Sequence, residues 1–289
     1  MTKKRNILLI ARAERFSPNS VERDAAILRA VADELKEQGH QVELCEEDAL
    51  PATTTADAIL SMGRNTATLR WLARLEEEGT SVVNSARAML GINRRRLLLT
   101  ARQLGVATAP FAVGPLEACP LPYPVWWKRD DRVSQEQGDV RLIRNEAEWA
   151  SVRASGIEEY VVEQHVKGDL VKFYSVSGTP FFHWNYPQFS KFGNEQANGE
   201  SNGFSFDAHE LKLQADRLAT ASGLTIFGGD AIVTPQGSTR IIDLNDWPSF
   251  SSCREEASKA IAAIATPLPC PPPGGRELAP STTEKINDL

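Results

Sequence analysis

The sequence predicts a mixed fold, with an α/β unit followed by an α+β region. In the first third of the chain, short apolar segments alternate with amphipathic helical segments, which is the pattern of a doubly wound parallel sheet. Farther along, dense apolar segments follow one another across turns, which indicates antiparallel hairpins. A chain of 289 residues can hold two or three structural units with buried cores.

The first unit is predicted to span residues 1–88. Strands are expected at 6–11, 41–45, 58–62 and 81–84, and helices at about 20–38 and 66–78. Gly39 ends the first helix. Because strands and helices alternate, the sheet should be parallel, with helices on its faces.

The remaining chain is predicted to form two further units, at 89–169 and 170–265. A helix at 94–104 precedes strands at 124–128 and 159–164, and a hairpin at 170–185 turns at Ser177 and Gly178. Helices are expected at about 208–222 and 254–265, on either side of a second hairpin around residues 235–238. Residues 266–289, rich in proline and polar residues, are predicted to be a disordered tail.

Composition limits the classes of partner. A net charge of −6 argues against a nucleic-acid-binding surface, and no apolar run is long enough to cross a membrane. The four cysteines are scattered without metal-binding spacing, as expected for reduced thiols in a cytoplasmic protein. We therefore expect small-molecule partners and allow for a homodimer.

The second hairpin carries an unusual polar face. Asp243 and Asn245 leave the same side of one strand, and a turn centred between Gln236 and Gly237 would place Asp230 opposite Asp243. Facing carboxylates repel, whereas two Asp oxygens and an Asn carbonyl suit Mg²⁺. The alternative is that Asp243 ends a strand and Asn245 forms a turn.

Basic residues form a second set of candidates. Lys128 follows the apolar residues Val125 to Trp127, either as an anion ligand or as a lysine that reaches to solvent. Arg94, Arg95 and Arg96 begin a helix, where cations oppose the helix dipole; this favours a nearby anion, although plain solvated arginines would also explain them.

The order of these segments resembles that of ATP-grasp proteins, in the branch of carboxylate-amine ligases and inositol phosphate kinases. The similarity covers about residues 82–265 and rests on VVNSARAML (82–90), the RRR helix ending LGVATAP, PVWWK (124–128), YVVEQHVKGDLVKFYSV (160–176), GLTIFGGDAIV (223–233) and RIIDLNDWPSF (240–250). It implies an ATP-grasp fold with an N-terminal pre-ATP-grasp domain, and ATP and Mg²⁺ as cofactors.

The resemblance also implies roles for individual residues. Lys128 would contact the ATP phosphates, with Arg94, Arg95 or Arg96 as the second basic group, and the Mg²⁺ ligands would be Asp230, Asp243 and Asn245. The adenine-contacting hinge would comprise Glu163, Gln164 and Val166, and Asp169 would hold the ribose. Two features depart from the family: Asp243 stands where many members have Glu, and residues 129–140 lack the usual glycine richness of the phosphate-covering loop.

The acceptor site is expected where basic residues meet the same cleft. Arg12 and Arg64 follow predicted strands, and Asn19 or Ser20 opens a helix whose N–H groups suit an anion. Lys172 and His183 lie on the first hairpin, and Lys191 and Glu195 lie in a long polar loop that could cover the site. Each also has a plainer interpretation, as a surface charge, a hairpin histidine or an ordinary surface loop.

The sequence thus predicts an ATP-dependent carboxylate-amine ligase that acts on a small-molecule acid and an amine, with Lys128, Lys172 and Arg95 in catalysis. One alternative is a kinase that phosphorylates a hydroxyl of a polyanionic substrate. Another is a nucleotide-binding regulator without turnover.

Overall fold

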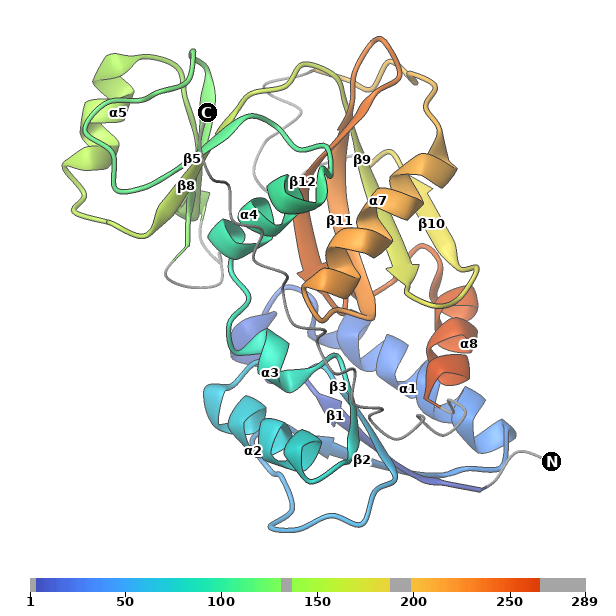
Figure 1. Ribbon diagram of the computed structural model, residues 1–289. Helices are drawn as coiled ribbons and strands as arrows, with labels where there is room; N and C mark the ends of the chain where they lie inside the picture. Colours follow the sequence, from blue (N-terminus) through green and yellow to red (C-terminus); the bar gives the residue numbers. More distant parts are fainter. Residues whose placement is uncertain (1–3, 131–136, 188–198, 266–289) are drawn as a thin grey trace, which may run out of the picture.

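The computed structural model describes residues 4–130, 137–187 and 199–265, which form three four-stranded sheets with helices between and around them (Figure 1). The N-terminal sheet comprises β1 (Asn6–Ala11), β2 (Gln41–Glu46), β3 (Ala58–Ser61) and β4 (Ser81–Val83). Its strands lie in the order β2-β1-β3-β4, and all are parallel, as the alternating sequence pattern predicts for this sheet's strand direction.

Helices cover both faces of this sheet. Ile7 and Leu9 of β1 pack toward α1 (Val21–Glu37), whereas Leu8 and Ile10 pack toward α2 (Thr66–Glu77). Successive side chains of a strand point to opposite faces, so an unbroken apolar strand is what a sheet between two helical layers requires. Short helices follow β1 and β4, at η1 (Glu14–Phe16) and α3 (Ala86–Met89).

A second sheet lies at the side of the molecule. It comprises β5 (Phe111–Val113), β6 (Val125–Arg129), β7 (Val140–Ile143) and β8 (Tyr160–Gln164) in the antiparallel order β5-β8-β6-β7. Alternate apolar residues, among them Val125 and Trp127, pack against α5 (Glu146–Arg153). The opposite face carries Trp126 and Glu163, which are cross-strand partners. The sequence analysis does not identify β5, β7, α5 or the short η2 (Gln137–Asp139).

The third sheet is antiparallel, in the order β10-β9-β11-β12. Its strands are β9 (Asp169–Val176), β10 (Phe182–Asn185), β11 (Ile226–Val233) and β12 (Thr239–Asp246). One face, with Phe173 and Phe227, is buried under α4 (Arg94–Leu104) and α7 (Ala208–Ala221). The other face carries Lys172, Asp230 and Asp243, so the polar positions of the predicted hairpins share one side.

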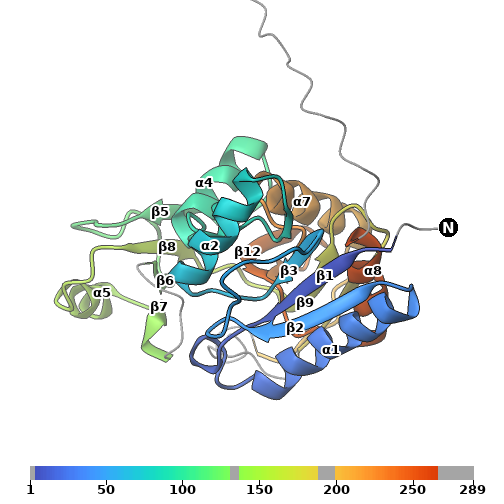
Figure 2. The same ribbon diagram turned by 90° about the horizontal axis from the view of Figure 1, so that it is seen from below.

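Helix α8 (Arg254–Ile264), near the end of the described residues, packs against the N-terminal unit. Its contact there is with α1, and the two helices lie side by side in Figure 2. Ile261 of α8 shares a buried core with Leu9 and Ile27. The unit predicted for residues 170–265 therefore contributes to the core of the N-terminal sheet, and the three unit boundaries stay a prediction.

Two predictions fall on segments outside the described residues. These are the tail at 266–289 and the larger part of the polar loop, at 188–198, which includes Lys191 and Glu195. Within the described residues, no helix combines the length and apolar character needed to span a bilayer.

Candidate active site

The β11–β12 hairpin places Asp230 directly opposite Asp243, as predicted. The turn itself lies half a residue earlier than predicted: Thr234 N–H donates to Ser238 O over 2.9 Å, and Gly237 takes the left-handed conformation with φ of 79°. The ladder would then pair Asp230 with Ile242. A bulge corrects this, because Ile242 is an extra residue without a partner on β11.

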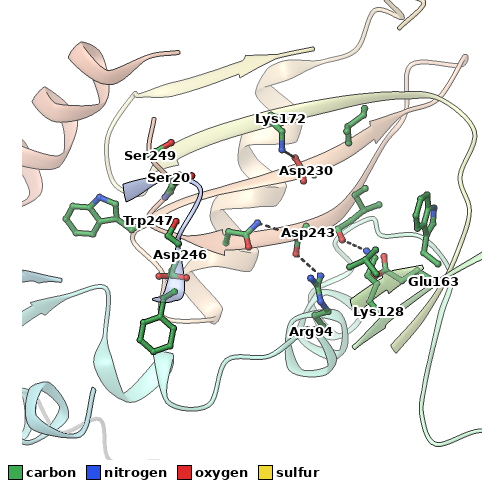
Figure 3. Close-up of a pocket in the computed structure, with 18 of the residues that line it drawn as sticks. Ser20, Arg94, Lys128, Glu163, Lys172, Asp230, Asp243, Asp246, Trp247 and Ser249 are labelled. Atoms are coloured by element: carbon green, nitrogen blue, oxygen red, sulfur yellow. Dashed lines mark hydrogen bonds and ion pairs between the residues drawn. The ribbon is translucent and has the colours of Figure 1, made fainter. Parts of the chain in front are cut away.

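A cavity of about 360 Å³ opens between the polar faces of the second and third sheets and reaches the N-terminal sheet. This volume falls within the range of about 300–1,000 Å³ that is usual for small-molecule sites. Figure 3 shows Asp230 and Asp243 near its middle, Lys128 and Glu163 at one end, and Asp246, Trp247 and Ser20 at the other. We call the end at Lys128 the hinge end and the end at Asp246 the far end.

The two carboxylates among the proposed Mg²⁺ ligands each face a cation. Lys172 Nζ lies 2.9 Å from Asp230 Oδ1, and Arg94 Nη1 lies 3.1 Å from Asp243 Oδ1. Asn245 donates from Nδ2 to Asp243 Oδ2 over 3.1 Å. Two carboxylates and an amide oxygen on adjacent strands are hard donors on one surface, which fits a divalent cation that keeps several waters.

The surrounding charges keep Asp243 ionised. Burial alone would raise the pKa of Asp243, but the charges of Arg94 and Lys128 outweigh it and hold the pKa below its ordinary value. The pKa of Lys172 is raised, chiefly by the charge of Asp230. Asp243 and Lys172 are therefore both charged at neutral pH.

Lys128 is fixed by two contacts at the hinge end. Its Nζ lies 2.7 Å from Glu163 Oε1 and donates to the carbonyl of Ile242 over 2.8 Å. The bulged residue Ile242 thus gives Lys128 an acceptor, and the same bulge brings Asp230 opposite Asp243. Glu163 Oε2 is buried and has no hydrogen-bond partner among the described residues, so an unmet acceptor stands at the hinge end.

Only the first arginine of the RRR helix lines the cavity. Arg94 lies one and two turns before the buried Leu98 and Ala101, so it shares their face of α4. Arg95 is exposed and outside the lining, and Arg96 Nη1 turns back to Gly91 O. The prediction of Arg95 as catalytic and Arg96 as ATP-binding therefore finds no support, because successive helical residues point about 100° apart.

The hinge end of the cavity contains the three residues that the resemblance assigns to an adenine-contacting hinge. Glu163, Gln164 and Val166 line the cavity, and so does Trp126 of β6. The indole Nε1 of Trp126 donates to His165 Nδ1 over 3.1 Å, and burial lowers the pKa of His165, which favours the neutral acceptor. Trp126 was not identified from the sequence, although its place two residues before Lys128 puts both on one strand face.

Asp169 does not line the cavity. Its carboxylate accepts hydrogen bonds from the backbone N–H groups of Asn202, at 2.8 Å, and Phe204, at 2.9 Å. Burial would raise the pKa of Asp169, but these backbone hydrogen bonds lower it below its ordinary value. Because the carboxylate is committed to the end of the polar loop, the predicted ribose contact finds no support at this residue.

The far end of the cavity contains a buried ion-pair network. Arg12 Nη1 lies 3.1 Å from Asp24 Oδ2 and Nη2 donates to Trp247 O over 3.0 Å. Arg64 holds Asp246 through both Nε and Nη2. Burial would raise the pKa of Asp246, yet Arg64 and Arg12 hold it below its ordinary value. The sequence analysis identified both arginines but gave no role to Asp246.

The other predicted acceptor residues are not brought together. Asn19 is exposed and outside the lining, whereas its neighbour Ser20 lines the far end. His183 lies opposite Tyr174 in the β9–β10 ladder, outside the lining, with the ring centroids 6.1 Å apart. Lys191 lies outside the described residues.

Comparison with known proteins identifies the fold. No protein-family model matches the sequence, and no curated protein matches it. The structure is similar to a RimK domain protein ATP-grasp from Sphaerobacter thermophilus, with a TM-score of 0.65, 17% identity, and coverage of 90% of this chain and 99% of that one. It is also similar to the ATP-grasp ligase PsnB in complex with a minimal precursor (TM-score 0.60, 16% identity, coverage 91% and 99%). A third similar structure is the D-alanine–D-alanine ligase from Bacillus anthracis in complex with ATP (TM-score 0.59, 12% identity, coverage 91% and 97%). The chain has the ATP-grasp fold.

Proposed function

We propose that this protein is an ATP-dependent ligase that joins a carboxylic acid to an amine through an acyl phosphate. The observation that carries the proposal is the opposed pair Asp230 and Asp243, which shares one cavity with Lys128, Arg94 and Lys172. The similar folds of the ATP-grasp ligase PsnB and of a D-alanine–D-alanine ligase that was solved in complex with ATP support a nucleotide in this cavity.

ATP would lie with its base at the hinge end and its phosphates over the middle of the cavity. Trp126 and Val166 offer apolar surface to a base, and Glu163 Oε2 offers an acceptor for an exocyclic amino group. Lys128 is the cation nearest this end and would contact the phosphates. Asp230, Asp243 and Asn245 would hold Mg²⁺, which when bound neutralises charge on the phosphates during phosphoryl transfer.

The chemistry then follows from placing an acid beside the phosphates. A carboxylate oxygen of the acceptor attacks the terminal phosphorus of ATP, and ADP leaves. The amine next attacks the acyl carbon, loses a proton, and displaces phosphate. Arg94 and Lys172 flank the middle of the cavity and would stabilise the charge that develops on the phosphoryl oxygens.

The charges of the far end favour an acceptor that is not strongly anionic. Arg12 and Arg64 are matched there by Asp24 and Asp246, so the four side chains sum to zero. A polyanionic acceptor, as in the kinase alternative, would need surplus cations at this end. The balanced network supports a substrate with one carboxylate, or one that carries both charges.

The experiment is a screen for ADP release with pools of acids and pools of amines, tested singly and in pairs. The proposal predicts ADP and phosphate when an acid pool and an amine pool are both present. Asp243→Ala should abolish ADP release. Arg95→Gln, at the exposed position next to Arg94, should retain it. ADP formation with a phosphorylated acceptor and no amine would support the kinase instead, and no ATP consumption would support a regulator.

A further inference from the structure

Each cation beside the proposed metal site is held by one of that site's own ligands. Lys172 pairs with Asp230, and Arg94 pairs with Asp243. These are the side chains that the ligase proposal assigns to phosphoryl oxygens. Lys172 Nζ contacts Oδ1 of Asp230 and Arg94 Nη1 contacts Oδ1 of Asp243, so a divalent cation that bound these two oxygens would take the place of both cations.

We propose that Mg²⁺ and the anionic substrate enter this site by ion-pair exchange. Mg²⁺ replaces the two cations on Asp230 and Asp243, and Arg94 and Lys172 turn to the phosphoryl groups. This inference rests on the nucleotide-binding part of the proposed function. It adds that the metal ligands pair with the phosphate-binding cations until the metal and the nucleotide bind.

Charge balance supports the exchange. One divalent ion carries the same charge as Arg94 and Lys172 together, so the two carboxylates remain neutralised before and after it binds. The side chains of Arg94 and Asp243 are 19% and 22% exposed, and those of Lys172 and Asp230 are 33% and 23% exposed. Charges that are only partly exposed still lose hydration and are unfavourable without a partner, so each released cation needs an anion.

The exchange has consequences of opposite sign for two ligands. Removing Arg94 or Lys172 takes away a cation that competes with the metal for a carboxylate, so the metal alone should bind more tightly. The same change removes a phosphate contact, so nucleotide should bind less tightly. A residue with only a structural role would weaken both ligands or neither.

The first test measures binding of Mn²⁺ alone, as a spectroscopic substitute for Mg²⁺, by electron paramagnetic resonance on the full chain without nucleotide. Arg94→Gln should lower the Mn²⁺ dissociation constant by about fivefold, a modest effect because the pair is partly solvated. Arg95→Gln is the matched control, since Arg95 lies one position along α4 but outside the cavity lining. An unchanged or raised dissociation constant in Arg94→Gln would overturn the exchange.

The second test measures binding of ATP in the presence of a chelator. Asp243→Asn releases Arg94 without any metal, so it should bind ATP about fivefold more tightly than the unmodified protein does. Asp24→Asn removes the same charge from the same cavity, but Asp24 pairs with Arg12 and not with Arg94. This variant should therefore show a smaller gain in ATP affinity. Adding Arg94→Gln to Asp243→Asn should cancel the gain.

The outcomes separate this inference from the proposed function. If the unmodified protein binds ATP with Mg²⁺ but Asp243→Asn gains nothing over Asp24→Asn in chelator, the exchange is wrong and the nucleotide site stands. If the unmodified protein binds no ATP with Mg²⁺, the nucleotide site itself is wrong. Melting curves of each variant, recorded beside the titrations, identify any that do not fold, and the first variant of the Mn²⁺ test differs from the first variant of the ATP test.

Discussion

Asp230 and Asp243 occupy directly opposite positions in the β11–β12 ladder. Like charges at such positions destabilise a sheet unless other groups compensate them. Here Lys172 and Arg94 each bind one carboxylate, at 2.9 and 3.1 Å. Each carboxylate therefore has a cation beside it, which offsets the repulsion between the two at the centre of the cavity.

Loss of the Asp243 carboxylate should reduce Mg²⁺-dependent ADP formation by about 100-fold or more, because a metal ligand acts on charge that develops in the transition state. Asp243→Asn keeps the size of the side chain while removing its charge. Asp33→Asn, at an exposed position of α1, serves as the control. Activity and Mg²⁺ dependence equal to those of the control would show that Asp243 is not a metal ligand.

Lys128→Met should lower the free energy of unfolding by about 3 kcal/mol, because it leaves Glu163 buried without its cation. The side chains of Lys128 and Glu163 are only 8% and 3% exposed. Chemical denaturation of Lys128→Met, Glu163→Gln and the double variant measures the coupling. The double variant should be more stable than the sum of the single losses predicts, whereas simple additivity would mean that the ion pair contributes nothing.

The Asp246 network should make stability fall in acid. The pKa of Asp246 in the folded protein lies below its ordinary value of 3.8, so its contribution is present above that pH and is lost as the pH falls through the folded value. Urea unfolding at a series of pH values below about 5 should show this loss. Asp246→Asn should be less stable at neutral pH and show a shallower acid dependence; an equally steep one would assign the effect to other carboxylates, such as Asp243 and Asp169.

Asp169→Asn should loosen the end of the polar loop. An amide offers one acceptor oxygen where the carboxylate offers two, so the N–H groups of Asn202 and Phe204 lose one of their partners. Hydrogen exchange across residues 199–207 should speed up roughly tenfold. Asp207→Ala, which removes the side-chain cap of α7, should speed exchange at His209 and Glu210 instead. Equal protection of 199–207 in Asp169→Asn would contradict the assigned anchor.

Local patterns account for what the sequence predicts well. Strands β1 and β3 are apolar runs followed by amphipathic helices, so nearby residues identify them. The hairpins are marked by glycine turns, so the pairing of their strands also follows from nearby residues. The Asp230–Asp243 pair was predicted correctly although the turn was misplaced, because the bulge at Ile242 offsets the error. No local pattern marks that bulge.

Contacts between distant segments account for what the sequence does not show. Asp246 meets Arg12 and Arg64 only after β12 packs beside the carboxyl ends of β1 and β3, so its acidic side chain is indistinguishable from a turn residue beforehand. Arg94 is different, because its spacing from the apolar Leu98 and Ala101 was available in the sequence and separates it from Arg95 and Arg96.

The most direct measurement of the central claim follows oxygen from the acceptor acid into phosphate. Once the screen has supplied an acid and an amine, the acid is labelled with oxygen-18 in its carboxylate and the phosphate released with ADP is examined by mass spectrometry. Ligation through an acyl phosphate transfers a labelled oxygen from the carboxylate to the phosphate. Unlabelled phosphate, or label retained entirely in the product and the unused acid, would contradict the account.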